Sequence, residues 1–218
     1  MMLQASGKSS MVMLQTKLAH PQLPPTLVPR ERLLQDLDAA FVHRLVLLSA
    51  PAGSGKTTLL STWADHAQTR VKALAWLSLD EMENDPTRFW TSIILTLRTC
   101  LPALGETALR MLHTPQPMPP STALTALIND ILAQGSEIIL VVDDYQVIVD
   151  QIIHEGMSFL LDHLPANLHL MLASRTDPDL PLSRWRMRGQ MIEIRATDLS
   201  FNQRSEEHTS ELQSRHNL

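Results

Sequence analysis

Cysteine is almost absent from this sequence: Cys100 is the only one among 218 residues, so no disulfide can form within the chain. Long apolar runs are also lacking, since stretches such as 45–48 and 138–142 fall far short of the roughly 20 residues that cross a bilayer. The N-terminus does not follow the charged, apolar and small order of a secretory signal. These absences predict a cytoplasmic protein without a membrane partner.

An excess of positive charge is missing as well. Lysine and arginine number 18 and aspartate and glutamate number 23, which gives a formal net charge of −5. Domains that bind DNA on their own usually carry a basic face that neutralises phosphates. We therefore do not expect this segment to bind DNA by itself. The apolar share of 44% and the charged share of 19% are typical of a globular domain.

Apolar segments of strand length alternate with helical patterns along the chain. We expect strands at 45–49, 73–79, 138–142, 168–173 and 191–195. We expect helices at 30–41, 56–67, 86–101, 121–133 and 152–164. Nearly continuous Val, Ile and Leu runs separated by helices indicate a parallel sheet that is buried on both faces, so the fold class is α/β.

The most specific functional signal is APAGSGKTT, which lies between the first expected strand and the following helix. It matches the phosphate-binding (Walker A) pattern Gly-x-x-x-x-Gly-Lys-Ser/Thr, with Ala50 in place of the first glycine. Successive backbone N–H groups and a helix N-terminus form an anion cradle in such loops. Lys56 would neutralise the β- and γ-phosphates, and the Thr57 hydroxyl would bind magnesium. The predicted nucleotide-binding residues are Ala50, Pro51, Ala52, Gly53, Ser54, Gly55, Lys56, Thr57 and Thr58.

A second motif, IILVVDD at 138–144, is an apolar strand that ends in two carboxylates. This is the Walker B arrangement, in which one acid holds the magnesium shell and the other polarises the attacking water. We assign Asp143 as the metal ligand and Asp144 as the catalytic base. Because neighbouring residues of a strand point to opposite faces, the two aspartates are not expected to share one role.

Arg175 follows the strand expected at 168–173. In P-loop ATPases with an added strand between the two Walker strands, a polar residue at this strand tip senses the γ-phosphate. Arg175 is therefore the predicted sensor and, with Lys56 and Asp144, the third predicted catalytic residue. The nine histidines show no metal-ligand spacing, so Mg²⁺ held with ATP or ADP is the only metal predicted.

Several phrases, read together, resemble one protein family. They are TKL at 16–18, VPRERLL at 28–34, AWLSLDEMENDPTRFW at 75–90, LVVDDYQVI at 140–148, FLLDHLPANLHLMLASRTDPDLPLSRWRMRGQ at 159–190 and IEIRATDLSF at 192–201. Together with the Walker A loop, they are similar to the N-terminal ATPase domain of the large ATP-binding LuxR-type (MalT-like) transcriptional regulators. These belong to the signal-transduction ATPases with numerous domains (STAND). The resemblance covers about residues 16–201.

The resemblance implies a three-layer P-loop NTPase with a five-stranded parallel sheet in the order 2-3-4-1-5 and a switch between ATP and ADP. It places Arg30 and Glu31 near the adenine or ribose. In the full-length protein it implies self-association, and DNA binding only through a C-terminal helix-turn-helix that this chain lacks. Gln146 departs from the family, which commonly has His after Asp-Asp-Tyr.

Composition sets the expected boundaries. Residues 1–28 mix Ser, Gln and Pro without a sustained period and are expected to form an N-terminal arm. The ATPase domain is expected at 29–201. Residues 202–218 are polar and resemble a translated sequencing adapter, so we expect a disordered, non-native tail on a truncated sequence.

Three functions fit these observations. The first is the switch domain of a signal-responsive transcriptional regulator, which binds ATP and hydrolyses it slowly as a weak Mg-dependent ATPase. The second is a P-loop kinase that would use the basic residues 184–188 as a lid, although the paired aspartates and the lack of an acceptor-binding motif disfavour it. The third is a nucleotide-binding interaction module without useful turnover.

Overall fold

The computed structural model describes residues 14–23, 30–38, 41–67, 73–114 and 119–200. Most of the predicted arm and the whole predicted tail at 202–218 lie outside these residues, so both boundaries stay predictions. Among the described helices, none is both long enough and apolar enough to cross a membrane.

One parallel sheet forms the centre of the molecule, with its strands in the order β2-β3-β4-β1-β5. The strands are β1 (Leu45–Ser49), β2 (Ala73–Ser78), β3 (Ile138–Asp143), β4 (Leu168–Ser174) and β5 (Met191–Arg195). The α/β class and the 2-3-4-1-5 order are thus confirmed.

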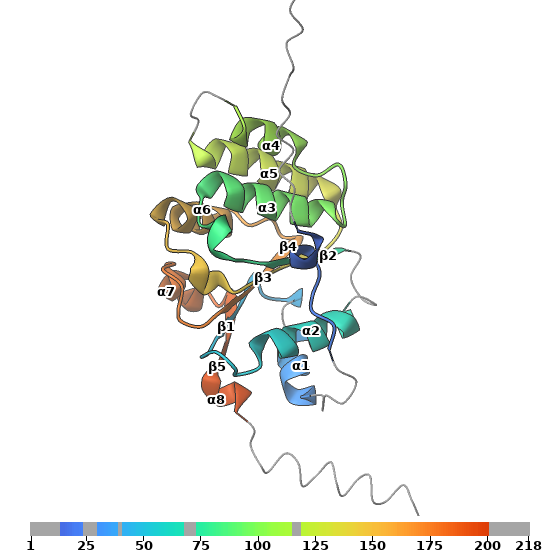
Figure 1. Cartoon of the computed structure of the whole chain (residues 1–218), viewed down its shortest axis with the longest axis vertical. Helices are drawn as coiled ribbons and strands as arrows, with labels where there is room; N and C mark the ends of the chain where they lie inside the picture. The colour runs from blue at the N-terminus through green and yellow to red at the C-terminus, as the bar shows by residue number, and fades with distance from the viewer. Residues whose placement is uncertain (1–13, 24–29, 39–40, 68–72, 115–118, 201–218) are drawn as a thin grey trace, which may run out of the picture.

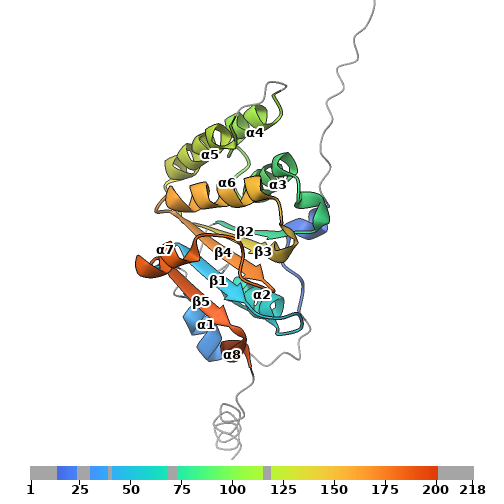
Figure 2. The same ribbon diagram turned by 90° about the vertical axis from the view of Figure 1, so that its left-hand side faces the viewer.

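Helices cover both faces of the sheet and give three layers (Figures 1 and 2). Side chains alternate along each strand, so Leu45 and Leu47 pack into one core while Val46 and Leu48 pack into the other. The first core lies under α3 (Pro86–Arg98), α4 (Glu106–Leu112), α5 (Pro120–Gln134), α6 (Gln151–Asp162) and α7 (Leu182–Met187). The second lies under α1 (Glu31–Asp38), α2 (Lys56–Ala67) and α8 (Ala196–Leu199).

Among the helices over the first core, the two short ones, α4 and α7, have no counterpart among the expected elements. Helix α4 begins directly after Gly105, whose left-handed φ of 71° ends the preceding loop. Helix α7 contains most of the basic segment 184–188, and its Leu182 and Trp185 share one face and are both buried. Both helices span too few residues to show a clear hydrophobic period.

The described part of the N-terminal segment packs beside strand β2 at the edge of the sheet. Its short 3₁₀ helix, η1 (Gln15–Leu18), contacts β2, and Lys17 reaches a second 3₁₀ helix, η3 (Glu81–Glu83). The Lys17 ammonium lies 2.7 Å from Asp80 Oδ2 and 2.8 Å from Glu83 Oε2. Burial favours the neutral amine, but these two carboxylates raise the pKa of Lys17 above its usual value. At least this part of the predicted arm is therefore held to the domain.

Candidate functional site

The loop between β1 and α2 needs glycine at two positions. Gly53 has φ 76° and Gly55 has φ 87°, in the left-handed region that residues with a Cβ avoid. A Cβ at either position would meet nothing within 4 Å, so the requirement comes from backbone conformation and not from crowding. The loop leads into the N-terminus of α2, whose first N–H groups have no partner within the helix. Ser54 Oγ is also buried without a partner among the described residues, so the loop suits an oxygen-rich anion.

Lys56 is the first residue of α2, and its side chain folds back into the loop. The residue is only 8% exposed, and its ammonium donates to the carbonyls of Ala50 at 2.5 Å and Pro51 at 3.0 Å. Burial lowers the pKa of Lys56, because a desolvated ammonium has lost its water. The hydrogen bonds of this ammonium go to neutral carbonyl groups, and hydrogen bonds to phosphate oxygens would be stronger.

Thr57 joins the loop to the end of β3. Its hydroxyl donates to Asp143 Oδ2 at 2.7 Å, across 86 positions of sequence. Asp143 is the last residue of β3 and is 2% exposed. A hydroxyl beside a carboxylate is a hard-oxygen pair of the kind that holds Mg²⁺ together with substrate phosphates. In the part of the chain that the structure describes, no cluster of three or more His, Cys, Asp or Glu could hold a metal ion.

Asp144 does not continue the strand. Its φ of 60° and ψ of 36° are left-handed, and it precedes the 3₁₀ helix η4 (Tyr145–Val147). Strand alternation is therefore the wrong reason for the separation of the two aspartates, because a tight turn separates them. The two carboxylates nevertheless have different partners, since Asp143 accepts from Thr57 and Asp144 accepts from Gln146.

Gln146 bridges Asp144 and the loop that follows β4. Its Nε2 donates to Asp144 Oδ1 at 2.7 Å, and its Oε1 accepts from the backbone N–H of Arg175 at 3.0 Å. Sequence reasoning noted position 146 only as a departure from the family. The bridge was missed because Gln146 and Arg175 lie 29 positions apart and meet only in the folded chain.

Arg175 is exposed beside the phosphate loop. Burial and, to a smaller degree, the positive charge of Arg175 lower the pKa of Lys56, so the two cations lie within Coulombic range of each other. Among the described residues, none accepts a hydrogen bond from the Arg175 guanidinium. The preceding residue, Ser174, has a buried hydroxyl without a partner there, and its carbonyl accepts from Ala50 N–H at 3.2 Å. The structure thus brings the predicted sensor to the phosphate loop.

The residues predicted near the base or sugar, Arg30 and Glu31, lie at the start of α1. Arg30 Nη1 donates to the Leu199 carbonyl at 2.5 Å and so links the start of α1 to the end of α8. Glu31 is exposed at the first position of α1, which packs on α2. Their contact with adenine or ribose stays a prediction. The remaining predicted loop residues divide by exposure: Pro51 and Ala52 are exposed, and Thr58 is half-buried.

Fold and site together define a P-loop ATPase domain, and comparisons with known proteins agree. The sequence model described as "AAA ATPase domain" matches residues 26–177. The chain belongs to this family. Among solved structures, Cdc6p from Pyrobaculum aerophilum matches with a TM-score of 0.52 and 20% identity, over 80% of this chain and 47% of that one. A Walker-type ATPase of Pyrococcus abyssi matches with a TM-score of 0.50 and 15% identity, over 78% of this chain and 54% of that one. These two likenesses show the fold alone.

Curated relatives narrow the family further. The HTH-type transcriptional regulator MalT of Cronobacter sakazakii is 36% identical over 190 residues, which are 87% of this chain and 21% of that protein. MalT of Yersinia enterocolitica is 36% identical over 197 residues, 88% of this chain and 21% of that protein. The resemblance to the ATPase domain of MalT-like regulators is thus confirmed, and the chain spans about a fifth of the length of these relatives.

We expect Asp143→Asn to raise the melting temperature of the nucleotide-free protein near pH 7. Burial raises the pKa of Asp143, so the folded state binds its proton more tightly than the unfolded chain does. The stability that this group contributes is therefore full below the unfolded pKa of about 3.9 and is lost as pH rises through the folded pKa. Thermal melts at several pH values above 4 should show the advantage of the variant growing with pH and then levelling. A variant that melts below the wild type at every pH contradicts the prediction.

Proposed function

We propose that this chain is a nucleotide-binding switch domain that binds Mg-ATP or Mg-ADP and hydrolyses ATP slowly within a signal-responsive transcriptional regulator. The observation that carries the proposal is the hydrogen bond between Thr57 and Asp143. It joins the phosphate loop to the predicted magnesium acid, which are the two parts that an ATPase of this class must bring together. AAA ATPase membership and the MalT relatives support the same function.

Each residue of the site has a role in this proposal. Lys56 would exchange its two carbonyl partners for phosphate oxygens, and Thr57 and Asp143 would hold the magnesium that accompanies the nucleotide. The bound ion would supply charge neutralisation at the β- and γ-phosphates. Asp144 would accept a proton from the attacking water, and Arg175 would contact the terminal phosphate.

The regulatory part of the proposal rests on the relatives. MalT is named an HTH-type transcriptional regulator, and the aligned residues make up 21% of its length. With a net charge of −5, the present chain lacks the basic excess that DNA binding requires. We therefore assign DNA binding to a C-terminal helix-turn-helix of the complete protein. We further propose that the complete protein is cytoplasmic and that it self-associates, as its resemblance to MalT-like regulators implies.

The kinase alternative is disfavoured by contacts of α7. A lid needs arginines that can move onto an acceptor, but Arg184 lies 2.5 Å from Asp162, and Arg186 pairs with Glu193. These ion pairs hold the basic residues to the domain itself. The interaction module without turnover differs from the switch only in hydrolysis, so a turnover measurement with and without an effector separates the two.

Nucleotide binding is expected to raise the melting temperature. A ligand that binds only the folded state at 100 times its dissociation constant adds about 2.7 kcal/mol of stability. Thermal melts with Mg-ATP, Mg-ADP, ATP with a chelator, and no nucleotide should therefore show the largest shifts when magnesium is present. The absence of any upward shift at millimolar Mg-nucleotide would falsify the proposed function.

A further inference from the structure

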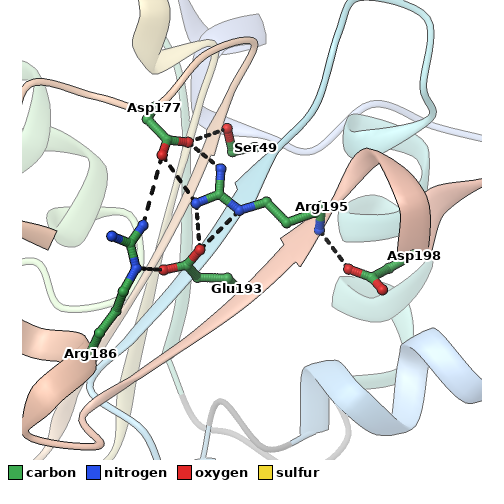
Figure 3. A network of polar contacts seen from close by, with 6 residues as sticks. All are labelled: Ser49, Asp177, Arg186, Glu193, Arg195 and Asp198. Carbon is green, nitrogen blue, oxygen red and sulfur yellow. Dashed lines mark hydrogen bonds and ion pairs between the residues drawn. The ribbon is translucent and has the colours of Figure 1, made fainter. Parts of the chain in front are cut away.

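The loop that carries Arg175 is held at both ends. At its start, Arg175 N–H donates to Gln146. Two residues further on, Asp177 lies at the centre of a polar network at the ends of β1 and β5 (Figure 3). Between these anchors, the Arg175 guanidinium has no hydrogen-bond or ion-pair partner among the described residues. The loop backbone is thus fixed while its one cation is available to a ligand.

Asp177 is bound from three sides. Ser49 Oγ, in the last residue of β1, donates to Asp177 Oδ1 at 2.7 Å. The guanidinium of Arg195 donates to both carboxylate oxygens, with Nη2 at 3.1 Å from Oδ2, and Arg186 Nη2 lies 3.7 Å from Oδ2. The hydrogen bonds from Arg195 hold the pKa of Asp177 below its usual value, so the carboxylate is charged. Asp177 therefore links the loop that carries Arg175, called here the sensor loop, to β1. Strand β1 leads directly into the phosphate loop.

Arg195 has a fixed orientation of its own. It is the last residue of β5 and pairs in register with Ser49 across the two strands. Its Nε donates to Glu193 Oε2 at 2.9 Å, and its backbone N–H donates to Asp198 Oδ2 at 2.8 Å (Figure 3). A planar guanidinium held on two edges presents its donors in one direction, which suits a carboxylate bound through both oxygens.

The exposure of this pair argues against a role in stability alone. The side chains of Asp177 and Arg195 are 45% and 33% exposed, and surface ion pairs of this kind contribute little to folding free energy. Their effect lies in geometry, because each contact restricts where the loop can place Arg175. A loop ordered before the ligand arrives loses less conformational entropy on binding.

We propose that Asp177 and Arg195 are positioning residues that hold the Arg175 loop so that its guanidinium meets the terminal phosphate of a nucleoside triphosphate. The inference rests on the proposed function. It adds the residues that determine the preference of the site for a nucleoside triphosphate over a diphosphate. A diphosphate lacks the phosphate that Arg175 would contact, so only triphosphate affinity should depend on the position of this loop.

The test compares Mg-ATP and Mg-ADP affinities by titration calorimetry on the whole chain. In Asp177→Asn, we expect affinity for Mg-ATP to fall about tenfold and affinity for Mg-ADP to stay within about twofold. Arg175→Gln should show the same selective loss. The variant that combines Asp177→Asn with Arg175→Gln should lose no more Mg-ATP affinity than Arg175→Gln alone, because Asp177 acts through Arg175. The melting temperature of Asp177→Asn should stay close to that of the wild type.

Asp162→Asn is the matched control. It removes a carboxylate that pairs with Arg184 of α7, 2.5 Å away, and that has no contact with the sensor loop among the described residues. Its ATP-to-ADP affinity ratio should equal that of the wild type. An unchanged ratio in Asp177→Asn, or an equal loss for both nucleotides, overturns the inference while nucleotide binding by the wild type upholds the proposed function. Failure of the wild type to bind either nucleotide overturns both.

Discussion

Lys56→Ala is expected to weaken Mg-ATP binding by a factor of about 10 to 100 or more. Charge-assisted hydrogen bonds contribute about 1.5 to 3 kcal/mol each, and every 1.4 kcal/mol is tenfold in affinity. Residues 50–58 contain no second lysine that could replace Lys56, whose ammonium donates to the loop carbonyls. Titration calorimetry with Mg-ATP measures the loss. The nucleotide-dependent shift in melting temperature should shrink in parallel.

The nucleotide-free stability of this variant separates a binding defect from misfolding. Burial lowers the pKa of Lys56, so without nucleotide the charged ammonium should add little to the stability of the fold. The melting temperature without nucleotide should therefore change by no more than about 4 °C, the shift that ~1 kcal/mol produces in a chain of this size. A variant that binds Mg-ATP as tightly as the wild type would remove Lys56 from the phosphate site.

Lys17→Ala is the control for loss of one positive charge. Lys17 forms ion pairs with Asp80 and the buried Glu83, away from the phosphate loop. Its removal leaves the Glu83 carboxylate without its cation, so the variant should melt lower. Its affinity for Mg-ATP should stay within about twofold of the wild type. Lys56→Ala should thus lose affinity for Mg-ATP and keep its stability, whereas Lys17→Ala should lose stability and keep its affinity.

Much of the sheet could be predicted because its strands are apolar on both faces. A strand such as Ile138–Asp143 is buried at every position, and a run of this kind shows directly in the sequence. The phosphate loop was equally visible, since Gly53 and Gly55 are required by local backbone conformation. Features that depend on consecutive residues can therefore be predicted from the sequence without a structure.

Contacts between segments that are distant in the chain could not be predicted from the sequence. The Gln146 bridge joins η4 to the residue after β4, and the Asp177 network joins three separate strand ends. Neither has a sequence period or a fixed spacing, because each depends on strand order and register. The left-handed turn at Asp144 was missed for another reason, since an aspartate after a strand adopts several conformations and the tertiary contacts select one.

Asp144→Asn is expected to slow ATP hydrolysis by a factor of about 100 to 10,000, the usual contribution of a positioned general base. Asparagine has the same shape and still offers an oxygen to Gln146 Nε2, which now lies 2.7 Å from Asp144 Oδ1. The site geometry and the affinity for Mg-ATP should therefore be kept, and only proton acceptance should be lost.

Single-turnover hydrolysis of bound ATP, with calorimetry on the same sample, separates these two quantities. Asp143→Asn is the matched variant, because it removes the neighbouring carboxylate, which accepts from Thr57 at 2.7 Å. It should weaken the magnesium-dependent part of binding, whereas Asp144→Asn should spare it. If Asp144→Asn abolished binding and the residual complex hydrolysed ATP at the wild-type rate, the roles of the two aspartates would be reversed. Asp144, in its left-handed turn, would then hold the metal, and the buried Asp143 would be the base.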